Sequence, residues 1–123
     1  MRYNVAILGA SNDASRYAWR AQRLLNEHGY PVFPVSLTHD EIDGTPAYRR
    51  LTDIPEAVDT ITVYVSPTNL QHCLPDILAI KPRRVIFNPG SESPQAMKIL
   101  RENGIIVEAA CTLVLLTTGQ FDR

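Results

Sequence analysis

Residues 5–16 read VAILGASNDASR, a short apolar run that meets a glycine and then a polar loop. The first four residues are apolar at every position, which is typical of a strand covered on both faces. Between Ala14 and His28 the apolar residues recur at helical spacing, and Gly29 follows where a C-cap glycine would stand. A buried strand that turns at Gly9 into an amphipathic helix indicates the first unit of a parallel α/β sheet.

The same alternation continues along the rest of the chain. Ser66 and Ser93 each precede a proline, the pattern of a helix N-cap followed by proline in the first turn. Further apolar or β-branched runs predict strands at 31–35, 60–65, 84–87 and 105–107. Strands that alternate with helices predict a Rossmann-like α/β fold, an open parallel five-stranded sheet of order 3-2-1-4-5 with helices on both faces.

Two segments carry finer local signals. Residues 40–48 are rich in turn-forming residues and predict an irregular excursion, and residues 51–57 predict a short helix capped by Asp53. Pro75 falls inside the helical stripe that follows Ser66-Pro67. We therefore expect a break there, with the main helix starting near Leu74.

Composition and charge exclude several classes of protein. The 123 residues are 45% hydrophobic and 20% charged, which excludes a disordered chain. Twelve basic side chains stand against thirteen acidic ones, so no nucleic-acid partner held by phosphate neutralisation is expected. The apolar runs fall short of the roughly 20 residues of a membrane helix, and two cysteines favour a reducing cytoplasm. We expect one cytoplasmic domain, residues 1–123, with no membrane partner.

The carboxyl ends of the predicted strands are the candidate site, because ligands of such sheets bind there. Gly9 lets the backbone turn tightly, and the free N–H groups of a helix start suit an anion such as a pyrophosphate. Arg16 adds a cation beside this loop. The other strand ends are also small and polar, and together they predict one crevice, bordered by Ser11, Asn12, Ser36, Ser66, Pro67, Asn88 and Gly90.

Two alternatives stay open at this point. Only one glycine of the dinucleotide fingerprint is present and no carboxylate ends the second strand, yet Asp40 or Glu41 could reach back to a ribose of NAD(P). The chain would then be a nucleotide-binding subunit of a larger assembly. Alternatively, it is a ligand-free scaffold that oligomerises, with a homodimer as one option, through a surface formed by Arg16, Trp19, Arg20, Arg23 and residues 113–116.

No acid–base constellation stands out among the side chains that usually carry chemistry. His28, His39 and His72 fall in three separate elements, so no metal site is expected. Cys73 lies on a helical stripe and reads as core, whereas Cys111 follows the fifth strand on the side where a ligand would bind. We assign no catalytic residue and leave open whether the protein is an enzyme.

Several stretches occur in the same order as in a known family. They are VAILGAS at 5–11, HGYPVFPV at 28–35, EIDG at 41–44 followed by Tyr48, LTDIP at 51–55, and the late Cys111. The chain resembles the small stand-alone CoA-binding proteins, which are similar to the N-terminal domain of the succinyl-CoA synthetase alpha subunit. The resemblance spans about Val5 to Leu115.

This resemblance implies a Rossmann-like domain that binds CoA or acyl-CoA in its strand-end loops and supplies no reaction, as a sensor or carrier would. It places the ligand's phosphates against Gly9, Ala10, Ser11, Asn12 and Arg16. Ser36 and Leu37 would border the adenine-ribose end, with Ser66 and Pro67 as the adjoining wall.

The sequence departs from the family pattern at three positions. Ser36-Leu37 stands where relatives tend to have Asn-Pro, and Ser66 rather than arginine precedes Pro67. Ala110 stands where an arginine usually precedes the late cysteine. Each change removes polar or cationic character from the expected crevice.

Overall fold

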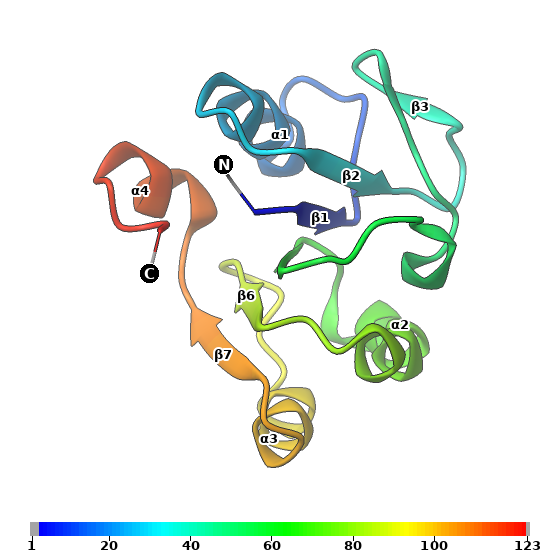
Figure 1. Cartoon of the computed structure of the whole chain (residues 1–123), viewed down its shortest axis with the longest axis vertical. Helices are drawn as coiled ribbons and strands as arrows, with labels where there is room; N and C mark the ends of the chain where they lie inside the picture. Colours follow the sequence, from blue (N-terminus) through cyan, green and yellow to red (C-terminus); the bar gives the residue numbers. More distant parts are fainter. Residues whose placement is uncertain (1–2, 123) are drawn as a thin grey trace.

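The computed structural model of the chain describes residues 3–122. Its main sheet holds five parallel strands in the order β2-β1-β5-β6-β7 (Figure 1). Val5 pairs with Val32 on one side and with Thr60 on the other, so β1 has neighbours on both edges. The strands are β1 (Val5–Leu8), β2 (Val32–Val35), β5 (Thr60–Val63), β6 (Arg84–Phe87) and β7 (Ile106–Ala109).

The predicted Rossmann-like sheet of order 3-2-1-4-5 is confirmed when one very short element is counted in the third place, and β7 then adds a sixth position. Beyond β2, Val35 makes an isolated parallel bridge with Tyr48, which takes the outer third place. Segment 60–65, which reads as the third strand in the sequence, contains β5 and lies on the other side of β1, in the fourth place. β6 and β7 then follow in chain order.

Helices cover both faces of the sheet (Figure 1). Over one face lie α1 (Tyr17–Glu27) and α4 (Thr112–Thr117). Over the other lie η1 (Leu51–Asp53), α2 (Pro67–Ile80) and α3 (Pro94–Glu102). Within residues 3–122, no helix has the length and apolar character needed to cross a bilayer.

The two-residue period of the strands divides the core into two halves. Ala6 and Leu8 of β1 belong to the half beneath α2 and α3, whereas Val5 and Ile7 belong to the half beneath α1 and α4. All four side chains are at most 3% exposed. Burial on both faces therefore explains why β1 is apolar at every position.

The first helix begins later than its apolar spacing predicts. α1 begins at Tyr17 rather than near Ala14. The reason is a local turn at Asp13, whose carboxylate accepts hydrogen bonds from the Ser15 N–H (2.9 Å) and hydroxyl (2.7 Å). The Asp13 carbonyl accepts a further bond from the Arg16 N–H (3.0 Å). This turn keeps the segment from Gly9 to Arg16 as a loop at the carboxyl edge of the sheet.

The short helix predicted within 51–57 is present as η1, but Asp53 is its last residue and not its cap, so that part of the prediction is wrong. The break predicted at Pro75 is wrong as well. α2 runs without a break from Pro67 to Ile80 and contains Pro75. Leu70 and Ile77, on either side of that proline, are fully buried against the sheet. Their packing offsets the hydrogen bond that proline cannot donate.

The excursion predicted at 40–48 is a small hairpin, β3 (Glu41–Ile42) paired with β4 (Thr45–Pro46). Asp43 and Gly44 at its tip have φ of 49° and 79°, the left-handed pair that a tight two-residue turn requires. Asp43 also lies near Arg23 of α1, at 3.5 Å. The hairpin therefore sits against α1, beside the loop that follows β1.

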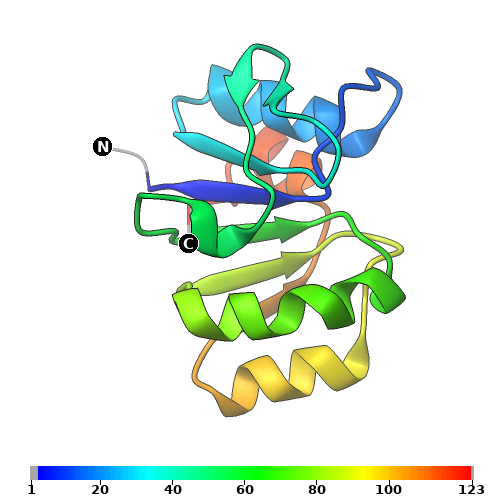
Figure 2. The same cartoon turned by 90° about the vertical axis from the view of Figure 1, so that its right-hand side faces the viewer.

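An aromatic cluster around a buried arginine closes the amino ends of the strands. Arg84 at the start of β6 donates from Nη1 to the carbonyl of Phe121 (2.8 Å), and its guanidinium lies 4.6 Å from the ring centroid of Phe121. The Tyr3 hydroxyl donates to the same carbonyl at 3.2 Å. The strand arrows in Figure 2 point away from this cluster, toward the edge where the polar loops gather.

Candidate ligand-binding site

Gly9 directs the backbone from β1 into the polar loop. Its φ is +90°, and a Cβ at this position would lie 2.9 Å from Cγ1 of Val65 and 3.2 Å from the backbone of Tyr64. Both the conformation and the close approach of the neighbouring chain therefore require glycine. The predicted role of Gly9 as a tight turn is consistent with this geometry.

The N–H groups of this bend divide into used and free donors. Those of Gly9 and Ala10 both donate to the carbonyl of Val35, at 3.3 and 3.1 Å, so they tie the loop to β2. The amides of Ser11 and Asn12 donate to no residue in the range 3–122. An anion at this loop would therefore find its backbone donors one or two residues later than Gly9 and Ala10.

The side chain of Asn12 is occupied by the hairpin. Its amide nitrogen donates to the carbonyl of Glu41 at 3.0 Å, and its oxygen accepts from the N–H of Asp43 at 3.0 Å. Asn12 thus fastens the loop to β3 and β4. Arg16 remains largely in solvent, with 72% of its side chain exposed and Asp13 at 3.8 Å as an ion-pair partner.

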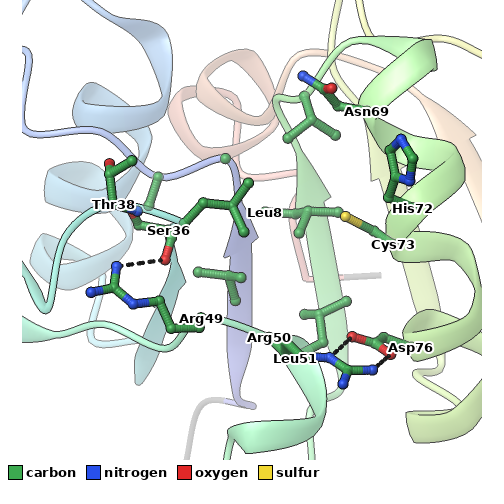
Figure 3. A pocket seen from close by; sticks show the side chains of 15 residues that line it. Leu8, Ser36, Thr38, Arg49, Arg50, Leu51, Asn69, His72, Cys73 and Asp76 are labelled. Atoms are coloured by element: carbon green, nitrogen blue, oxygen red, sulfur yellow. Dashed lines mark hydrogen bonds and ion pairs between the residues drawn. The ribbon is translucent and has the colours of Figure 1, made fainter.

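Two hollows flank Gly9. The first cavity, about 360 Å³, lies between the end of β2, the segment before η1 and the start of α2 (Figure 3). Its apolar lining comes from Leu8, Val35, Leu37, Leu51 and Val65. The second cavity, about 390 Å³, lies over the start of α1 and is lined by Gly9, Ser11, Asp13, Arg16, Tyr17, Ala18, Tyr64 and Pro89. One hollow is therefore suited to a flat apolar group and the other to a polar chain or an anion.

The charged side chains of the first cavity are held in pairs. Arg50 donates from Nη2 and Nε to the two carboxylate oxygens of Asp76, at 2.7 and 3.1 Å (Figure 3). The hydrogen bonds that Arg50 donates to Asp76 raise the pKa of Arg50, which stays a cation at any ordinary pH. On the opposite wall Arg49 donates to Asp40 at 2.7 Å and to the carbonyl of Ser36 at 3.4 Å.

The amino-acid sequence alone did not single out the α2 wall of this cavity. Asn69, His72, Cys73 and Asp76 of α2 all line it (Figure 3). His72 and Cys73 each lie three or four residues from both Asn69 and Asp76, so the four positions share one face of the helix. That spacing, read from the Ser66 cap onward, is the signal that could have found them. Burial raises the pKa of the Cys73 thiol, which packs against the core as predicted.

A model of the family described as CoA binding domain matches residues 3–117. The chain belongs to the CoA binding domain family. It is 34% identical over 62 residues to the alpha subunit of ADP-forming acetate–CoA ligase II from Pyrococcus furiosus. That match covers 50% of this chain but only 14% of the ligase subunit.

Relatives of similar size also exist. The chain is 24% identical over 100 residues to the uncharacterized protein YneT of Bacillus subtilis, which covers 81% of this chain and 74% of YneT. The crystal structure of an uncharacterised protein superimposes with a TM-score of 0.92 and 40% identity, over 98% of this chain and 99% of that one. The Rossmann-like architecture of this CoA binding domain is therefore shared with a solved structure over nearly its full length.

Other predicted site residues of this CoA binding domain lie near the cavities but do not line them. Ser66 caps α2, where its Oγ accepts the N–H of Asn69 at 3.3 Å, and Pro67 is the first helical residue. Gly90 is exposed and donates its N–H to Glu92. Among the predicted residues, those that line a cavity are Gly9, Ala10, Ser11, Arg16, Ser36 and Leu37.

Asn88 lies in the interior, at 3% exposure. Its amide nitrogen donates to the hydroxyl of Thr62 (2.7 Å) and the carbonyl of Val63 (3.0 Å), and its oxygen accepts the N–H of Thr112 (2.8 Å). All of these bonds are internal to the protein. Asn88 thus joins β5, β6 and α4 beneath the site, and its neighbour Pro89 forms the lining of the second cavity.

Tyr64 is an unusual polar group in the wall of the second cavity. Its hydroxyl oxygen is inaccessible to solvent and has no hydrogen-bond partner among residues 3–122. Burial raises the pKa of Tyr64 to about 12, so the hydroxyl stays protonated.

The residues that the structure describes contain no cluster of three metal-ligating side chains. Of the three histidines, only His72 lines either of the cavities that flank Gly9.

Proposed function

We propose that residues 1–123 form one domain that binds CoA or acyl-CoA at the carboxyl edge of the sheet. Family membership supports a CoA ligand. The observation that carries the proposal is that Gly9 lines both cavities. An adenosine group in the apolar first cavity would be joined, through phosphates that pass Gly9, to a pantetheine arm in the second.

The phosphates would bind at the start of α1. Ser11, whose N–H is free, lines the second cavity together with Tyr17 and Ala18 of the first turn of α1, where the positive end of the helix dipole lies. Arg16 lines the second cavity with most of its side chain in water, so it can turn from Asp13 toward an anion at small cost. The adenine ring would lie against Leu37, which is 84% exposed at the lip of the first cavity.

We further propose that the domain acts as a sensor or carrier and catalyses no reaction. In the first cavity the ionised groups bind each other or a neighbour, as Arg50 binds Asp76 and Arg49 binds Asp40. Arginine does not release its proton in a protein, so these pairs can orient a charged ligand but their guanidinium groups supply no general acid.

Calorimetric titration with CoA, acetyl-CoA and NAD tests the proposal. We expect CoA and acetyl-CoA to bind and NAD to bind more weakly. Arg16→Gln should weaken CoA binding by about 10-fold, because one charge-assisted hydrogen bond is lost. Arg101→Gln, a change at an exposed arginine of α3, is the matched control and should leave affinity unchanged. Absence of binding at millimolar CoA would refute the proposal.

A further inference from the structure

Arg49 stands on the rim of the first cavity with a loosely held guanidinium. It donates from Nη1 to the carbonyl of Ser36 at 3.4 Å (Figure 3). It also donates from Nη2 to Asp40 at 2.7 Å. The Asp40 side chain is 93% exposed and that of Arg49 is 46% exposed. An ion pair so open to water is weak, and a stronger anion can replace its carboxylate.

Arg50, the neighbouring guanidinium, is not available in the same way. It forms two parallel hydrogen bonds with Asp76, whose side chain is only 12% exposed. Breaking that pair would leave a poorly hydrated carboxylate against the core. Of the arginines that line the first cavity within residues 3–122, Arg49 is therefore the one with charge to offer a ligand.

We propose that Arg49 binds a phosphate carried on the ribose of the bound nucleotide, and so selects the 3′-phosphate of CoA. This inference rests on the proposed function. With adenine in the first cavity and the 5′-phosphates beside Gly9, the ribose lies between them. The first residue beyond β2 on that path is Ser36, whose carbonyl Arg49 already contacts. A ribose phosphate at this place meets the guanidinium directly.

The chemistry of the two anions favours the exchange. A phosphate monoester carries up to two negative charges and three oxygens that match the fork of a guanidinium. Asp40 offers one charge from a flexible, hydrated side chain and returns to water at little cost. The Arg49–Asp40 pair thus holds the guanidinium at the rim until a phosphorylated ribose displaces the carboxylate.

Calorimetric titration with CoA and with dephospho-CoA, which lacks only the 3′-phosphate, separates this inference from the proposed function. The wild-type protein should bind CoA at least about 10-fold more tightly than dephospho-CoA. Arg49→Gln should remove this preference and leave dephospho-CoA affinity unchanged. Asp40→Asn should strengthen the binding of CoA, but not of dephospho-CoA, by about 3-fold, since it removes the competing anion. Arg101→Gln is the matched arginine control.

The outcomes are distinct. A preference that disappears in Arg49→Gln supports the inference, and the Asp40→Asn result supports it without any loss of the arginine. Equal binding of the two ligands by wild type, or a preference that survives in Arg49→Gln, overturns it while CoA binding stands. Tighter binding of NADP than of CoA also overturns it, because NADP carries its ribose phosphate at the 2′ position. If neither CoA nor dephospho-CoA binds, the proposed function fails and the inference fails with it.

Discussion

Gly9 is the residue at which the backbone leaves the sheet and at which the two cavities meet. Its left-handed φ of +90° and its distance from Val65 leave no space for a side chain. The position therefore has two separate requirements, one conformational and one steric. A methyl group at this position would push the loop away from Tyr64 and Val65 and would move the free amides of Ser11 and Asn12 with it.

Gly9→Ala should destabilise the protein by about 3 kcal/mol, the sum of a left-handed alanine and a close contact. Urea unfolding would measure the change in the free energy of unfolding. Gly104→Ala is the matched control, because Gly104 has a φ of +78° but no neighbouring atom within 4 Å of the place that a methyl group would take. Gly104→Ala should lower the free energy of unfolding by about 1–2 kcal/mol. Equal losses in the two variants would contradict the steric part of the argument.

At the scale of single elements, local signals predicted most of the framework. β1, β5 and β6 are buried at every position, and their apolar or β-branched residues identified them as strands. The serine–proline pairs at Ser66 and Ser93 predicted the N-caps of α2 and α3, and both hydroxyls accept the expected N–H. A cap depends on four consecutive residues, which is why it can be read without knowing the fold.

Features that depend on distant parts of the chain could not be read in this way. The continuity of α2 through Pro75 depends on packing against the sheet, which no local pattern records. At the first cavity, Arg50 donates a hydrogen bond to Asp76, which lies 26 positions further along the chain. This bond crosses the space between η1 and α2. The site prediction therefore found the strand-end loops but missed the side chains that α2 and the segment before η1 bring to them.

The start of β5 is tied to the start of β6 by one ion pair, which gives a pH-dependent prediction. Asp59 accepts hydrogen bonds from Nε and Nη2 of Arg83 at 2.9 and 3.0 Å, and from the Thr60 hydroxyl at 2.7 Å. Burial alone would raise the pKa of Asp59, but these hydrogen bonds outweigh it and lower the pKa below its usual value. The Asp59 carboxylate thus stabilises the fold at pH values above the pKa that it has in the unfolded chain, about 3.9. This stabilisation is lost as the pH falls through the lower pKa that Asp59 has in the folded protein.

Asp59→Asn should therefore reduce the free energy of unfolding at pH 7 by about 1–2 kcal/mol, the worth of hydrogen bonds to a partly exposed charge. The difference from wild type should narrow as the pH falls from about 4 toward 2, since the wild-type carboxylate becomes protonated. Urea unfolding at several pH values measures this difference. If the difference in the free energy of unfolding stayed constant over this range, the ionised carboxylate would contribute nothing to stability.

At the scale of the whole molecule, the carboxyl and amino ends of the strands form two edges of the sheet that have different roles. The carboxyl edge carries the loops that follow the strands (Figure 2). Both cavities and the free donors of the site also lie there. The amino edge is closed by Arg84, Tyr3 and Phe121, which join residues 118 positions apart. Stability and ligand binding should therefore respond to different substitutions.

Phe121→Ala tests the stability half of this division. Phe121 is 2% exposed, and its ring covers the guanidinium of Arg84, which is itself fully buried. Removing the ring leaves a cavity beside a buried charge, so the free energy of unfolding should fall by about 3–5 kcal/mol. CoA affinity should stay within about twofold of wild type, because additive behaviour is expected of sites far apart.

Leu37→Ala is the reciprocal variant. Leu37 is 84% exposed at the lip of the first cavity, so its loss should change the free energy of unfolding by less than about 0.5 kcal/mol. It should weaken CoA binding by about 3- to 10-fold, because the adenine ring would lose an apolar contact surface. Urea unfolding and calorimetric titration of both variants complete the comparison. If Phe121→Ala weakened CoA as much as Leu37→Ala does, the two edges would be energetically coupled, and the carboxyl edge could not be treated as a binding surface that the rest of the sheet merely supports.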